Sequence, residues 1–158
     1  PPPPPPPPPR PKPPPPQLNG PIAAPEPKPR LRWIADRITG TALGGYDPVA
    51  YFFGNGPRLG SRDHQYDWSG TTWQFVDVGS LAAFRDAPEV YAPRFGGRCA
   101  FAVANGRPTE GSPRHWLIVD GRLLLFADTV SRAAFLQDPG RLLAEAERRW
   151  PALLADLP

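Results

Sequence analysis

The chain has 158 residues, among them 27 prolines, one cysteine and no methionine. Eighteen of the prolines lie within residues 1–30, where large apolar side chains are almost absent. Such a segment cannot pack a core, so residues 1–30 are predicted to form a disordered proline-rich linker. Residues 31–158 hold every aromatic side chain and are long enough for one domain. The single cysteine excludes an internal disulfide framework.

The net charge of +3 belongs to the linker, because residues 31–158 carry 14 basic and 14 acidic side chains. A folded nucleic-acid module usually carries a basic face on its own globule. We therefore expect no nucleic-acid partner for this chain.

The proline run at the start of the sequence is typical of an extended polyproline II spacer. Because the sequence begins without methionine, we expect that an export or anchor segment preceded Pro1 and was removed. The domain would then work in the periplasm or elsewhere outside the cytoplasm, with the linker leading to a membrane anchor or an envelope partner. A second interpretation uses Arg10 and Lys12, since basic proline-rich segments also bind aromatic-lined grooves of the SH3 type.

The first half of the domain is predicted to contain two strands and two short helices. In chain order these are a helix over 31–38, a buried strand over 49–53, a strand over 71–76, and a helix that Ser80 caps and Pro88 closes. Residues 62–65, which include His64, have the composition of a solvated polar loop.

The second half is predicted to contain a hairpin and three helices. The Asp120-Gly121 pair suits a two-residue turn between strands 116–119 and 123–126, and short helices are expected over 99–104, 131–137 and 139–150, the last ended by Pro151. The chain is thus predicted to be a small single α+β domain over 31–158, with a short antiparallel sheet, a β-hairpin and several short helices. No internal repeat is apparent.

Two stretches have an unusual density of glycine, proline and aromatic residues. They are GYDPVAYF at 45–52 and YAPRFGGRCA at 91–100. Together with Trp73-Gln74-Phe75 and Trp150-Pro151, this order resembles the YHS-domain proteins, in particular a small bacterial branch, over about residues 38–152. The resemblance implies a small α+β fold related to the metal-binding TRASH-like domains.

In the metal-binding pattern of that family, cysteines stand at three positions that hold Ala50, Val76 and Ser80 here. The standard three-cysteine site for a metal such as copper or zinc is therefore absent. Arg98 also stands where the branch usually has tyrosine. The resemblance then implies a YHS-type binding module whose ligand is unknown.

Cys99 is the first candidate for chemistry. With His115, and a carboxylate such as Asp47, it could form a three-ligand copper or zinc site. The same thiol and imidazole could serve a thiol-dependent enzyme. The simplest interpretation is that Cys99 is a small buried residue of the core.

A ligand cleft near the two glycine-rich stretches is the second candidate. Its predicted lining residues are Tyr46, Asp47, Tyr51, Arg94, Gly96, Gly97 and Arg98, with Phe95 beside the tyrosines. The two arginines would favour an acidic ligand, and the glycines would permit a close approach of the backbone. The sequence thus favours a non-enzymatic YHS-type binding module of the bacterial cell envelope; a Cys99-dependent enzyme and a purely structural protein-interaction domain are the alternatives.

Overall fold

A computed structural model describes residues 1–11, 33–35, 40–54 and 56–157. It confirms a small α+β fold, in which the described residues form two separate two-stranded antiparallel hairpins and several short helices. The elements in chain order are η1 (Leu43–Gly45), η2 (Ala50–Phe53), β1 (Ser61–Trp68), β2 (Thr71–Phe75), α1 (Val78–Asp86), α2 (Pro88–Tyr91), η3 (Arg94–Gly97), α3 (Ala100–Ala104), β3 (Ser112–Val119), β4 (Arg122–Phe126), α4 (Thr129–Phe135) and α5 (Pro139–Ala155).

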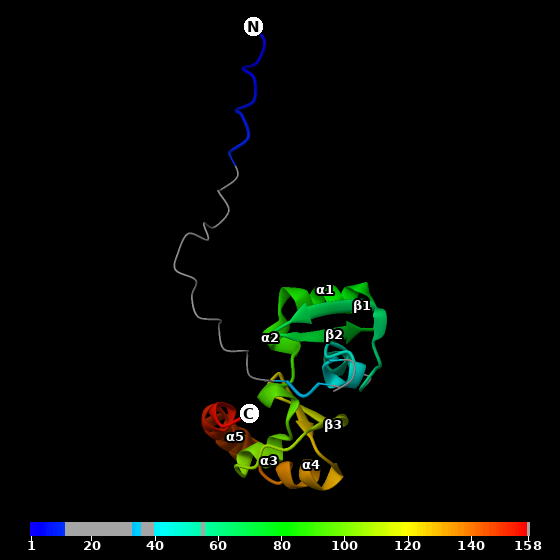
Figure 1. The fold of residues 1–158 in the computed structure, drawn as a ribbon, viewed down its shortest axis with the longest axis vertical. Helices are drawn as coiled ribbons and strands as arrows, with labels where there is room; N and C mark the ends of the chain where they lie inside the picture. The colour runs from blue at the N-terminus through cyan, green and yellow to red at the C-terminus, as the bar shows by residue number, and fades with distance from the viewer. Residues whose placement is uncertain (12–32, 36–39, 55, 158) are drawn as a thin grey trace.

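The hairpins lie in different halves of the molecule. In Figure 1, β1 and β2 lie with α1 and α2 in the upper half, whereas β3 lies with α3, α4 and α5 in the lower half. Each half has its own apolar core, and β4 contributes to both. Leu123 and Leu125 belong to the core of the first half, while Leu124 and Phe126 belong to the core of the second. Because successive side chains of a strand point to opposite faces, β4 separates the two cores and contributes side chains to both.

The two hairpins have the same register. Ser61 pairs with Phe75 in the first hairpin, and Ser112 pairs with Phe126 in the second. In both, a shift in register follows that pair, and four regular pairs continue to the turn. Each residue of the second hairpin lies 51 positions after its counterpart in the first.

The helices after the hairpins begin in the same way. The Asp77 carboxylate accepts a hydrogen bond from the Ser80 amide at 2.8 Å, and the Asp128 carboxylate accepts one from the Ser131 amide at 2.7 Å. These pairs are again 51 positions apart. Each aspartate is therefore the N-cap of the helix that follows its hairpin.

The glycine-rich turns before the hairpins also correspond. Leu43 and Phe95 have left-handed backbone conformations, with φ of 57° and 60°, and two glycines with positive φ follow each. The next amide, of Tyr46 or Arg98, donates to the carbonyl of Leu43 or Phe95, at 3.1 Å in both cases. The structure therefore contains an internal repeat, and the prediction that the chain has none was wrong.

The buried strand predicted over 49–53 is replaced by the short 3₁₀ helix η2. The Asp47 carboxylate accepts from the amide of Val49 at 2.7 Å and from that of Ala50 at 3.4 Å, which holds the chain in a tight turn. The apolar run indicated burial correctly at Val49 and Tyr51, each 2% exposed, but not at Phe53, which is 71% exposed. Its backbone conformation was decided by the preceding aspartate.

Residues 62–65, predicted as a loop, lie within β1. Half of the residues of β1 are exposed and most are polar, so its sequence lacks the apolar alternation of a half-buried strand. Its conformation comes from pairing with β2, where Trp73 and Phe75 are buried.

The prediction that Pro88 closes the first helix is confirmed, since α1 ends at Asp86 and a separate short helix, α2, begins at Pro88. The predicted stop at Pro151 was wrong, because Pro151 lies inside α5, which continues to Ala155. Pro151 is exposed, where water can replace a missing backbone hydrogen bond. Similarly, Asp77 and not Ser80 is the N-cap of α1.

The beginning of the chain is described only in part. Residues 1–11 are exposed and have no regular secondary structure. Of the helix predicted over 31–38, only 33–35 are described, and Ala35 forms a β-bridge with Ala42 there. No helix among the described residues is long and apolar enough to cross a membrane.

Candidate functional site

Asp47 is fully buried and holds two segments of the first half together. Besides the two amides of its own turn, its carboxylate accepts a hydrogen bond from the Val76 amide at 3.0 Å. Its hydrogen bonds to the Val49 and Ala50 amides give Asp47 a local structural role. With both oxygens engaged inside the protein, Asp47 does not face a ligand.

Tyr51 is buried at the contact between the two halves. Its hydroxyl donates to the Pro113 carbonyl at 2.6 Å, and its ring packs edge-on against Trp116, with the centroids 5.3 Å apart. Burial raises the pKa of the Tyr51 phenol above its ordinary value, and the proximity of Tyr46 and Asp47 adds to this shift. Tyr51 is thus a structural residue here.

Cys99 belongs to the core of the second half, with no exposed surface. Its amide donates to the Thr109 carbonyl at 2.8 Å, and its backbone lies beside Leu125 of β4. His115 is half-buried at the irregular start of β3. Within the described part of the chain, no three histidine, cysteine, aspartate or glutamate side chains are grouped so that they could hold a metal ion. Cys99, His115 and Asp47 therefore do not form the three-ligand site considered from the sequence.

The three positions that the sequence resemblance aligns with cysteines lie close together. Ala50, Val76 and Ser80 line a common pocket of about 210 Å³, together with Phe53, Arg58 and Asp77. Zinc and copper sites of this kind need thiolate or imidazole donors. A methyl, an isopropyl and a hydroxyl group do not supply them, so these residues do not fit the family's metal.

A larger cleft of about 430 Å³ lies where the two halves meet, and tryptophans form much of its wall. Trp33 precedes the first half, Trp68 ends β1, and Trp150 comes from α5. We call this site the tryptophan cleft; its remaining lining residues are Glu89, Ala92, Pro93, Arg94, Phe95, Gly96, Glu147, Pro151 and Leu154. Its volume lies within the range of small-ligand sites, about 300–1,000 Å³.

Ring contacts hold the walls of the cleft in place. The Trp33 and Trp68 ring centroids are 5.3 Å apart, and those of Phe95 and Trp150 are 5.8 Å apart. Below Trp150, the buried Arg98 guanidinium lies 5.6 Å from the indole ring, and burial lowers the pKa of Arg98 although Glu110 opposes the shift. The Trp33 indole N–H is buried without a hydrogen-bond partner among the described residues. Such a donor costs free energy until an acceptor reaches it.

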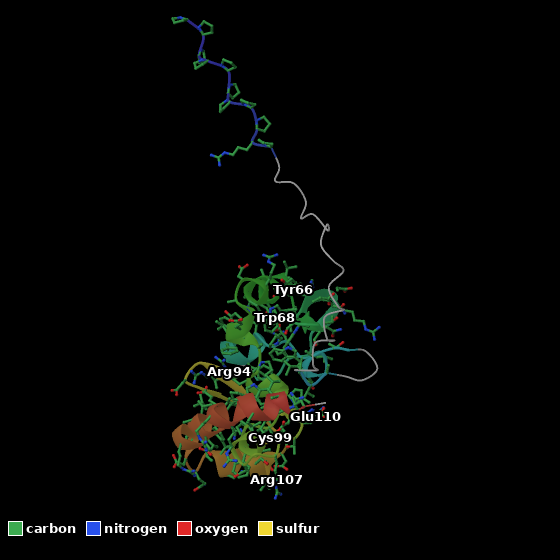
Figure 2. The ribbon with its side chains drawn as sticks, turned by 60° about the vertical axis from the view of Figure 1, so that its left-hand side comes forward. Tyr66, Trp68, Arg94, Cys99, Arg107 and Glu110 are labelled. Atoms are coloured by element: carbon green, nitrogen blue, oxygen red, sulfur yellow. The ribbon has the colours of Figure 1, made fainter. Side chains whose placement is uncertain are left out.

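The charged groups of the cleft lie at its edge. Arg94, Glu89 and Glu147 are exposed, and Glu147 forms an ion pair with Arg122 at 2.8 Å. Figure 2 shows Arg94 between Trp68 and the α5 helix. The cleft thus offers flat apolar faces in its wall and both signs of charge at its rim.

The predicted ligand residues are only partly assembled by the fold. Arg94 and Gly96 line the tryptophan cleft together with Phe95, as expected from their adjacency. Gly97 lies against Ile34 in a neighbouring pocket, and Arg98 lies beneath Trp150. Tyr46, Asp47 and Tyr51 do not line the tryptophan cleft.

Sequence reasoning missed the three tryptophans. They stand far apart in the chain and belong to no common motif, so only the packing of the two halves brings them together. The available signal was the five tryptophans in the domain, three of which are half-buried here around a single cleft.

Comparisons of the chain with models of protein families, with curated protein sequences and with solved structures find no match. The fold and site therefore define a structural class, a small α+β protein built from two structurally equivalent halves. The tryptophan cleft between them is the site on which its function is argued.

Proposed function

We propose that this chain is a non-enzymatic binding module of the YHS type, and that the tryptophan cleft is its binding site. The observation that carries the proposal is the meeting of Trp33, Trp68 and Trp150 around one cleft of about 430 Å³. Aromatic rings give a ligand large contact area at low cost in conformational entropy, which is why tryptophan is enriched at binding sites.

The resemblance to the YHS-domain proteins has support in the fold. The residues at the three family cysteine positions are distant in sequence, yet Ala50, Val76 and Ser80 line one pocket. A correct alignment to a metal-binding family predicts such convergence. Because the thiols are missing from that pocket, binding is assigned to the cleft, and no metal is part of the proposal.

A non-enzymatic role accords with the burial of Cys99. A nucleophile has to reach its substrate, and the Cys99 side chain is covered by the core of the second half. We also propose that the module works outside the cytoplasm, in the bacterial envelope, where the proline-rich linker would act as a spacer.

The proposal is tested by nuclear magnetic resonance of the full chain, using the indole N–H signals of the five tryptophans, each assigned with a Trp→Phe variant. The probes are N-acetylprolinamide, N-acetylargininamide, N-acetylglutamic acid amide and zinc ion. Binding at the cleft is expected to shift the signals of Trp33, Trp68 and Trp150 with at least one organic probe. Trp116, which packs against Tyr51 outside the cleft, is the internal control. Organic probes that move Trp116 alone, or no tryptophan, would contradict the assignment.

A further inference from the structure

We propose that the tryptophan cleft binds the proline-rich segment 1–16 of a second copy of this chain. This inference rests on the proposed function, because it names the ligand of the same cleft. It joins two features that are otherwise unrelated, a basic proline run and an aromatic cleft in one polypeptide.

The segment has the chemistry of a polyproline II ligand. Fourteen of its 16 residues are prolines, and Arg10 and Lys12 are its only charged side chains. Polyproline II makes three residues per turn at about 3.1 Å per residue and forms no internal hydrogen bonds, so its rings and carbonyls remain available to a partner. Since proline already fixes φ, little backbone entropy is lost on binding.

The cleft presents what such a ligand needs. Proline rings pack on flat aromatic faces, and Trp68 and Trp150 provide these from opposite halves of the molecule. The indole N–H of Trp33, a residue that lines the cleft, is a buried donor without a partner among the described residues, and a hydrogen bond to a ligand carbonyl would remove the cost of leaving it unpaired. A cleft of about 430 Å³ accommodates on the order of one turn, or about 9 Å, of polyproline II.

The rim of the cleft offers one acidic side chain that can pair with the basic residues of the segment. Glu89 is exposed at the rim and forms no ion pair within the part of the chain that the structure describes. It is available to Arg10 or Lys12, whereas Glu147 already has Arg122. Arg94 opposes the basic segment, so the register has to place the cation nearer to Glu89 than to Arg94.

The second copy is chosen as the source because residues 1–11 are all exposed. Figure 1 draws these residues extended and away from both halves, so they do not contact the cleft of their own chain. One chain thus presents a ligand segment and a cleft at different places. A segment that enters the cleft of another copy makes a heterologous contact, which can add further copies.

The test is a complementation experiment by sedimentation velocity over a range of concentrations. The segment variant is the full chain with every proline of residues 1–16 replaced by glycine or serine, keeping Arg10 and Lys12. The cleft variants are the full chains with Trp150→Ala or with Glu89→Lys, the second being an exposed change that leaves the core intact. Urea unfolding of each variant verifies that it is folded.

The unaltered chain is expected to self-associate as concentration rises, and more weakly as salt is added. The segment variant and each cleft variant should associate at least about tenfold more weakly. A mixture of the segment variant with a cleft variant should associate again, as pairs that do not grow, because one partner supplies the cleft and the other the segment. Asp63→Lys, the same charge reversal at an exposed position of β1 outside the cleft, should not weaken association.

Three outcomes would overturn the inference. An unaltered chain that stays monomeric up to its solubility limit excludes binding between copies. The inference is overturned by this result even if the segment instead occupies the cleft of its own chain. Association that survives in the segment variant uses another surface. A mixture that fails to associate excludes the complementary contact. If the small probes still shift the cleft tryptophans in these cases, the proposed function stands and only the ligand is wrong.

Discussion

The Tyr51 hydroxyl donates a 2.6 Å hydrogen bond to the Pro113 carbonyl, across 62 positions of sequence. Tyr51 belongs to the 3₁₀ helix of the first half and Pro113 to the first hairpin strand of the second. The bond therefore joins the two halves. Trp116, against which the Tyr51 ring packs, belongs to the same strand.

Tyr51→Phe should lower the free energy of unfolding by about 1–2 kcal/mol, because the Pro113 carbonyl loses its donor while the ring is kept. The pH dependence has a definite sign. Burial raises the pKa of folded Tyr51 above the unfolded value of about 10, so its contribution is complete below pH 10 and is lost as pH rises further. Urea unfolding from about pH 8 to about pH 11 should show a smaller alkaline loss in Tyr51→Phe than in the unaltered chain. Equal losses in both would mean that Tyr51 is not the group responsible.

Asp47→Ala should destabilise the protein by about 3 kcal/mol, because three backbone amides lose their acceptor in a buried site. Asp47→Asn, which retains one acceptor oxygen, should have a smaller effect. Urea unfolding measures both. Asp63→Ala, an exposed change in β1, is the control and should leave stability unchanged. A wild-type midpoint for Asp47→Ala would show that the carboxylate does not hold the turn.

The equivalence of the two halves predicts equal effects at equivalent caps. Asp77→Ala and Asp128→Ala each remove the acceptor for one amide at the start of a helix, at nearly the same distance. Each should lower the urea midpoint by a similar amount, and the double variant by their sum, since the sites are independent. Asp86→Ala, near the end of α1, is the control. A large effect at only one cap would show that the two caps share the same geometry but contribute unequally to stability.

Cys99 should be inert toward a thiol reagent in the folded protein and should react when urea opens the core, because its side chain has no exposed surface. Cys99→Ala should cost only about 1 kcal/mol, as expected for the loss of one small buried group. It should leave the shifts produced by the probes at the cleft tryptophans unchanged. Rapid reaction under native conditions would revive the thiol-dependent alternative.

Placing cysteines at the three positions that the resemblance aligns with the YHS metal-binding pattern tests that resemblance directly. The variant with Ala50→Cys, Val76→Cys and Ser80→Cys should retain about one zinc per chain after desalting, because the three positions line one pocket and thiolates bind zinc strongly. Its unfolding midpoint should rise when zinc is present. The matched control carries Ala50→Ser and Val76→Ser, which gives three hydroxyls at the same positions and should retain none. Failure of the folded cysteine variant to bind zinc would mean that the positions were aligned incorrectly.

Local signals were good predictors of the turn of the second hairpin and of the short helices of the second half. The turn Asp120-Gly121 was recognised because its residues tolerate left-handed backbone conformations, and both have positive φ. The polar strand β1 was missed because its stability comes from β2 and not from its own pattern. The repeat was missed for a related reason. Asp77, Ser80 and Phe84 recur 51 positions later as Asp128, Ser131 and Phe135, but the strands β1 and β3 share little sequence although their pairing is the same.

The sequence by itself determined the α+β class, the proline-rich segment with its positive charge, and the absence of thiols at the three family positions. These are matters of composition, local turn chemistry and residue identity. Only the tertiary structure decided that Asp47 and Tyr51 are structural, that Cys99 is covered, and that Trp33, Trp68 and Trp150 share a cleft. Each depends on contacts between segments distant in the chain. The same holds for the proposed ligand. The basic proline-rich segment is evident from the sequence, but its proposed binding site, the tryptophan cleft, is formed only by the fold.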